Sequence, residues 1–81
     1  MPTVFRDGAF RFFFYSNEGL PLEPLHIHVR ARGKEAKIWL EPEAAIANSH
    51  GFSPRELGAI LKIAIARQED IREAWYDHFG D

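Results

Sequence analysis

The sequence contains no cysteine, which excludes disulfide bonds, thiolate metal sites and thiol redox chemistry. It also lacks a long hydrophobic run, since no stretch approaches the roughly 18 apolar residues that suggest a membrane-spanning helix. The first residues show no basic leader followed by an apolar segment and a small-residue cleavage site, so no signal peptide is predicted. We therefore expect a cytoplasmic protein with no membrane partner.

Recognisable catalytic and nucleotide-binding motifs are also missing. Gly33 and Gly58 do not form the glycine-rich fingerprint that cradles a phosphate, and no nucleophile motif, paired-carboxylate pattern or internal repeat is visible. The formal net charge of −2 argues against a strongly basic nucleic-acid-binding protein. The sequence leaves open whether the protein is an enzyme.

Aromatic side chains, by contrast, are abundant. The 81 residues include seven Phe, two Tyr and two Trp, and each buried aromatic removes roughly 150–250 Å² from water. One domain, residues 1–81, is therefore expected to fold without covalent staples. Residues 1–40 carry six Lys/Arg and four Asp/Glu, whereas residues 41–81 carry four and eight. This asymmetry is typical of two different partner surfaces, and also of ordinary solvated faces.

The β-rich half, residues 1–41, has the pattern of two hairpins. Asp7-Gly8 between β formers is a strong hairpin signal, because type I′ turns need positive φ at both central positions. Gly33-Lys34 is expected to form the second turn. The four predicted strands are Thr3–Arg6, Ala9–Tyr15, Leu25–Arg32 and Glu35–Leu40.

Side chains alternate between the two faces of a strand, so the second hairpin has an apolar face and a polar face. A slip of one residue would exchange the faces, so the assignment depends on the turn. The apolar face holds Ile27, Val29, Ala31, Ala36, Ile38 and Leu40. On the polar face, the expected register places Arg32 opposite Glu35, Arg30 opposite Lys37 and His28 opposite Trp39.

The second half, residues 42–81, has the signals of helices. Pro42–Asn48 predicts a short helix, and Ser53 begins a capping box with Glu56. Apolar residues then recur at helical spacing, which predicts one long helix over Pro54–Phe79. A bend near Arg67-Gln68-Glu69 is an open alternative. We expect an α+β fold in which a four-stranded, mostly antiparallel sheet is covered on one face by the short and the long helix.

Several ordered motifs cover nearly the whole chain. They are Met1-Pro2-Thr3-Val4, the run from Phe12 to Gly19, His26-Ile27-His28-Val29, the run from Ala36 to Pro42, Gly51-Phe52-Ser53 and Ala74-Trp75. In this order they resemble the bacterial domain-of-unknown-function family 4160. Pro24-Leu25 departs from the family pattern, which has two prolines before the His-x-His. The resemblance implies a short stand-alone protein encoded beside a second small protein, in pairs regarded as toxin–antitoxin candidates. It implies no particular chemistry.

The pair His26 and His28 is the most distinctive local feature. Two residues apart on a strand, both imidazoles project from one face, roughly 6–7 Å apart at the backbone. This spacing suits a shared zinc or other divalent metal ion, which needs a further ligand. The candidates for that ligand are Glu23, Glu41, His50 and His78. No other cofactor is expected.

Two further hypotheses use the same face. In the first, His26 and His28 act as acid and base in a small hydrolase or nuclease-like toxin, with Arg30 and Lys37 holding a phosphate. In the second, the face binds a partner, either the small protein encoded nearby or RNA. The oligomeric state stays open, and a purely structural role for the histidines is the simplest alternative. The predicted binding face comprises Tyr15, His26, His28, Arg30, Arg32, Lys37 and Trp39.

Overall fold

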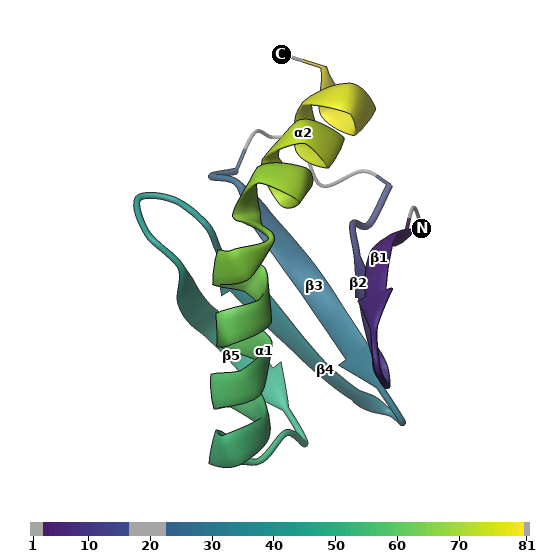
Figure 1. Cartoon of the computed structure of the whole chain (residues 1–81), viewed down its shortest axis with the longest axis vertical. Helices are drawn as coiled ribbons and strands as arrows, with labels where there is room; N and C mark the ends of the chain where they lie inside the picture. The colour runs from purple at the N-terminus through teal and green to yellow at the C-terminus, as the bar shows by residue number, and fades with distance from the viewer. Residues whose placement is uncertain (1–2, 17–22, 81) are drawn as a thin grey trace.

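A computed structural model describes residues 3–16 and 23–80. Its strands are β1 (Thr3–Asp7), β2 (Phe10–Phe13), β3 (His26–Ala31), β4 (Lys34–Trp39) and β5 (Ala45–His50), and its helices are α1 (Pro54–Ala66) and α2 (Gln68–Phe79). The strands follow one another in an antiparallel meander, β1-β2-β3-β4-β5. Figure 1 shows both helices in front of the same face of the sheet. The predicted α+β class is confirmed. Met1-Pro2 and Asn17-Glu18-Gly19, from two of the motifs, lie outside the described residues.

The predicted short helix over Pro42–Asn48 is wrong, and so is the expected number of four strands. Ala45–His50 forms β5, the fifth strand, and pairs with β4. Ile46 lies opposite Ile38 and packs against the core. Pairing with β4 and partial burial of Ile46 outweigh the helix propensity of the neighbouring alanines, which is a weak local preference.

The predicted single helix is divided in two at Arg67, which ends α1 and precedes α2. Arg67 has φ −113° and ψ 23°, outside the helical region. Its guanidinium carbon lies 3.9 Å from the centre of the Phe5 ring on β1, and its Nε donates to Asp70 Oδ2 at 3.1 Å. These contacts hold the junction against β1. No helix in the described part of the chain is long and apolar enough to cross a membrane.

The start of α1 agrees with the sequence. The backbone N–H of Glu56 donates to Ser53 Oγ at 3.1 Å, and the backbone N–H of Ser53 donates to Glu56 Oε1 at 2.8 Å. Pro54 occupies the first turn, where its missing N–H costs nothing. The capping box is confirmed, and Lys34 adds a 3.0 Å ion pair from Nζ to Glu56 Oε2.

The second hairpin turns one residue earlier than predicted. Arg32 and Gly33 form the turn with φ of 49° and 79°, and Ala31 pairs with Lys34. Two positive φ values are the signature of a type I′ turn, whose twist matches that of the strands. The three expected cross-strand pairs were wrong, because the partners shift by two residues. The even shift leaves the faces as predicted. The observed pairs are Arg30 with Glu35, His28 with Lys37 and His26 with Trp39.

The first hairpin differs in turn type. Asp7 pairs with Phe10, so Gly8 and Ala9 are the central residues. Gly8 has φ 59°, and Ala9 is not among the residues with positive φ. Positive φ at the first central position alone is typical of a type II′ turn, not the expected type I′.

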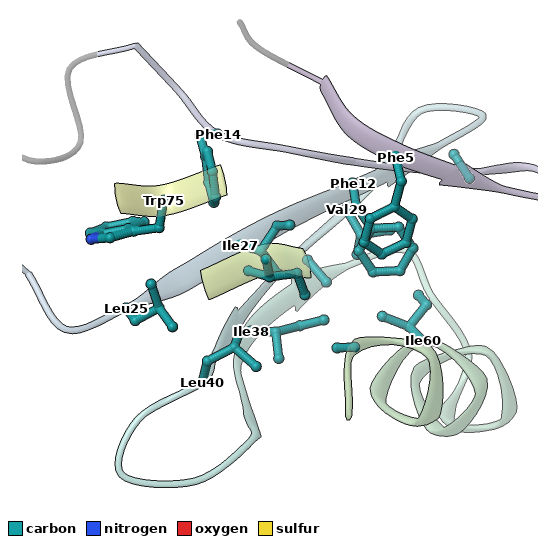
Figure 2. Close-up of a cluster of buried hydrophobic side chains, with 14 of the residues drawn as sticks. Phe5, Phe12, Phe14, Leu25, Ile27, Val29, Ile38, Leu40, Ile60 and Trp75 are labelled. Atoms are coloured by element: carbon teal, nitrogen blue, oxygen red, sulfur yellow. The ribbon is translucent and has the colours of Figure 1, made fainter. Parts of the chain in front are cut away.

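The core lies between the sheet and the two helices (Figure 2). Phe5 and Phe12 stack at a ring-centroid distance of 4.5 Å, and Ile60 reaches them from α1. Trp75 from α2 packs edge-to-face on Phe14 at 5.4 Å. Full burial of each large apolar side chain contributes about 1.5–3 kcal/mol. Because the helices cover this face of the sheet, the opposite face of the sheet is the one available to bind a ligand or partner.

Candidate functional site

The sheet face opposite the helices, called here the open sheet face, gathers nearly all of the predicted site residues. Within the described residues, neither helix packs over its centre (Figure 1). Arg32 is the exception, because it lies exposed in the turn. The members that we assign to the face are Arg6, Arg11, Phe13, Tyr15, His26, His28, Arg30, Glu35, Lys37 and Trp39.

Strand register arranges these residues in rows that cross the sheet. The first row runs through β1 to β5 and contains three arginines in succession. Neighbouring strands lie about 4.8 Å apart, so residues in a row are direct neighbours. The first row is Arg6, Arg11, Arg30, Glu35 and His50; the second is Phe13, His28, Lys37 and Asn48; the third is His26, Trp39 and Ala45.

A hydrogen-bonded network joins three side chains at the centre of the face, and a fourth lies beside it. Arg30 Nη2 donates to Glu35 Oε1 at 2.7 Å and to the Tyr15 hydroxyl at 3.0 Å. The Tyr15 hydroxyl in turn donates to Glu35 Oε2 at 2.8 Å. His28 Nδ1 lies 3.7 Å from the same Glu35 oxygen. Glu35 is therefore the hub of the network.

The network shifts the pKa values of its members, and those of Glu35 and Tyr15 bear on its charge state. Burial alone would raise the pKa of Glu35, but hydrogen bonds from Arg30 and Tyr15 outweigh burial and hold it below its usual value. Burial, followed by the hydrogen bond to the Glu35 carboxylate, raises the pKa of Tyr15. At neutral pH the network thus contains a carboxylate, a neutral phenol and a guanidinium.

Cations lie over the aromatic rings of this face. The guanidinium carbons of Arg11 and Arg30 lie 4.7 and 5.3 Å from the Phe13 ring centre. Lys37 Nζ lies 4.3 Å from the Trp39 ring and pairs with Glu23 Oε1 at 2.8 Å. Each such contact contributes about 0.5–1 kcal/mol at an exposed site. The arginine heads are therefore held at fixed positions over the sheet.

His26 is enclosed and has no solvent-exposed surface. Its ring lies 5.5 Å from Trp39 and 5.2 Å from Trp75, centroid to centroid. Its Nδ1 lies 2.9 Å from the Pro24 carbonyl oxygen, and since a carbonyl only accepts, Nδ1 carries the proton. His26 is thus a buried packing residue at the edge of the open sheet face. His28 is also buried, with 7 % of its surface exposed.

The predicted metal ligands do not form one cluster. In the described ranges, no group of three or more His, Cys, Asp or Glu residues is placed to hold a metal ion. Glu41 pairs with Arg72 at 2.7 Å, and His78 stacks on Phe14 on the helix-covered side. His50 lies at the end of the first row, opposite Glu35.

Sequence reasoning missed the central role of Glu35 and the arginine row. The signal was present in the alternation of the strands. Once the turn is placed at Arg32-Gly33, Arg30 falls opposite Glu35 and Arg11 opposite Arg30. The sequence does not connect Arg11 to β3, because the pairing of β2 with β3 crosses a long loop that carries no register signal.

Comparison with protein-family models gives a match over residues 9–76 to a family described as "Domain of unknown function (DUF4160)". The matched span includes every member of the open sheet face except Arg6. Comparison with curated proteins gives no match. Comparison with solved structures also gives none.

Proposed function

The chain belongs to the DUF4160 family, and we propose that it is a small interaction domain that binds single-stranded RNA through the open sheet face. The observation that carries the proposal is the row Arg6, Arg11 and Arg30 on three adjacent strands. Like charges directly opposite each other destabilise a sheet. An anionic ligand lying along the row would offset that repulsion, and phosphate is the anion that guanidinium groups bind in bidentate fashion.

The aromatic residues of the face favour a single strand over a duplex. Tyr15 and Trp39 are partly exposed beside the arginine and lysine heads. Unstacked bases pack against aromatic rings and against guanidinium planes, and such stacking contributes about 1–3 kcal/mol per base. A sheet that has helices on its back and cations with aromatics on its front provides both interactions at once.

The proposal extends to a partner protein. We assign the chain to a toxin–antitoxin-type pair, in which the second component is a small protein encoded nearby. The support is the separation of charge, because four acidic side chains lie exposed on α2, opposite the basic sheet face. They are Glu69, Asp70, Glu73 and Asp77. This pairing can be tested by co-expressing the chain with the neighbouring gene product and purifying the complex through a tag on either chain. Failure of the two chains to co-purify would contradict it.

Binding to a fluorescently labelled ten-nucleotide oligouridine, followed by anisotropy, tests the RNA proposal. Arg11→Gln should weaken binding, because Arg11 lies at the middle of the row. Arg55→Gln is the matched control, since Arg55 is exposed at the start of α1, which lies on the other face of the sheet. Equal affinities for the two variants would contradict the proposal. Trp39→Ala should also weaken binding through lost stacking.

A nuclease-like hydrolase is the second candidate, and one observation favours it. His28 and Glu35 lie 3.7 Å apart beside Arg30, so an acid, a base and a phosphate-binding cation are close together. The enclosed position of His26 makes Glu35 the better companion for His28 in this scheme. Cleavage of the oligouridine by the wild-type protein, lost in His28→Ala and Glu35→Gln, would support catalysis. An intact oligouridine after long incubation would reject it. Zinc binding by His26 and His28 stays a prediction that zinc titration checks.

A further inference from the structure

A groove with a volume of about 420 Å³ lies at the C-terminal end of α2. None of its lining residues belongs to the open sheet face. The groove is built from three separate segments: the chain before β3, the chain after β4, and the last turns of α2. Its walls include Glu23, Pro24, Glu41, Trp75, Tyr76 and Phe79.

The helical side of the groove is aromatic. Trp75 and Phe79 are one turn apart on α2, and their ring centroids are 4.4 Å apart. Tyr76 is 49 % exposed, so its ring is accessible at the rim of the groove. Aromatic faces attract cations through their quadrupole, and a tyrosine at the rim offers such a face to an incoming group.

The opposite side of the groove carries two carboxylates, each of which is paired with one cation. Glu41 and Glu23 reach it from different loops, and their side chains are 45 % and 40 % exposed. Arg72 and Lys37 each contact one carboxylate oxygen, but a carboxylate accepts several hydrogen bonds. The C-terminal end of α2 adds the negative end of its dipole. No lysine or arginine is among the described residues that line the groove.

These features select the chemistry of the occupant. An anion would find no cation among the described lining residues and would face the negative end of the helix dipole, and a purely apolar group would leave the remaining acceptor sites of the carboxylates desolvated. An arginine side chain can interact with both sides of the groove. Its apolar stem packs on the aromatic side, and its planar guanidinium stacks on aromatic rings and binds carboxylates.

We infer that the groove binds an arginine side chain presented by an extended segment of a partner protein. The stem lies along Trp75 and Phe79, and the guanidinium lies over Tyr76 and donates to Glu41. The lining residues of the groove differ from the members of the open sheet face, and the two surfaces meet where Glu23 pairs with Lys37 and Trp75 contacts His26.

Titration of ¹⁵N-labelled protein with N-acetyl-arginine amide, observed by NMR, tests the inference. The neutral isostere N-acetyl-citrulline amide is the control ligand. The Trp75 indole N–H and the Tyr76 and Gly80 amides should shift with a dissociation constant on the order of millimolar, as expected for one side chain. Citrulline should leave them in place. Equal shifts with both ligands, or none with arginine, would overturn the inference.

Two variants locate the site on the groove. Glu41→Gln should weaken arginine binding about three- to fivefold, whereas Glu43→Gln, an exposed residue two positions away that does not line the groove, should not. Tyr76→Ala provides a second test, because a half-exposed side chain is truncated without disturbing the core; it should also weaken binding severalfold. Identical affinity in Glu41→Gln, Tyr76→Ala and Glu43→Gln would overturn the assignment.

Discussion

Arg30 on β3 faces Glu35 on β4, and the 2.7 Å contact between Nη2 and Oε1 joins the arginine row to the Tyr15–His28 cluster. Glu35 is the one carboxylate in that row among the described strands. Its state sets how much positive charge the face presents to a ligand.

Removing the charge of Glu35 should change the titration of Tyr15. Burial raises the pKa of Tyr15 first, and the Glu35 carboxylate raises it further. Glu35→Gln should therefore lower the pKa of Tyr15, because burial is then opposed by the lowering effect of Arg30. The phenol absorbance measured against pH reports this in a Tyr76→Phe background, where Tyr15 is the only tyrosine. A Tyr15 pKa unaffected by Glu35→Gln would contradict the network.

The free energy of unfolding should decrease in acid because two glutamates become protonated. The pKa of Glu35 is lowered by its partners despite burial, and the pKa of Glu56 is lowered by the Ser53 backbone N–H and by Lys34. A carboxyl with a lowered folded pKa binds fewer protons in the folded state, so the unfolded state gains protons first as pH falls. The free energy of unfolding should decline below about pH 5, near the usual glutamate pKa.

Urea denaturation at a series of pH values measures that decline. The double variant Glu35→Gln/Glu56→Gln should show a flatter profile than the wild type between about pH 5 and pH 3. Glu43→Gln/Glu69→Gln is the matched control, because both residues are exposed. Profiles of equal steepness for the two double variants would show that other groups cause the acid sensitivity.

The type I′ turn predicts a stabilising substitution. Arg32 has φ 49°, a left-handed conformation that costs an ordinary residue about 1–2 kcal/mol and that asparagine adopts more readily. Arg32→Asn should raise the free energy of unfolding by about 0.5–1 kcal/mol. Gly33→Ala should lower it, because alanine is strained at φ 79°. Denaturation curves that place Arg32→Asn below the wild type would contradict the turn geometry.

His26 should prove to be a structural residue. It has no exposed surface and lies between two tryptophans. His26→Ala should therefore leave a cavity and destabilise the protein by about 2–4 kcal/mol, in the range of other large-to-small core substitutions. Thermal unfolding measures the effect. A variant as stable as the wild type would show that His26 is dispensable for folding and would return it to the list of functional candidates.

The polar face was predictable because strand alternation survives an even shift in register. Moving the turn from Gly33-Lys34 to Arg32-Gly33 changed every partner on that hairpin and exchanged no faces. The capping box at Ser53 was predictable for a related reason, since its signal is contained within four neighbouring residues.

Long-range features were not predictable. Whether Ala45–His50 is helix or strand depends on β4 lying beside it. Local propensity contains no information about which strand lies next to a segment. The enclosure of His26 depends on Trp75, which belongs to the far end of the chain. The sequence left a bend near Arg67-Gln68-Glu69 open, and the contact of Arg67 with Phe5 on β1 accompanies the break that the structure has there. In the first two cases a contact distant in sequence decided the outcome.

The salt dependence of oligouridine binding tests the central claim most directly. Each phosphate contact to a single strand contributes a slope of about −0.7 to the logarithm of affinity against the logarithm of salt concentration. The double variant Arg6→Gln/Arg11→Gln removes two cations of the row, so its slope should be shallower than that of the wild type by about 1.4. Arg55→Gln/Lys62→Gln removes two exposed charges of α1 and should leave the slope unchanged. Equal slopes in the two double variants, or no binding by the wild type at low salt, would contradict the account.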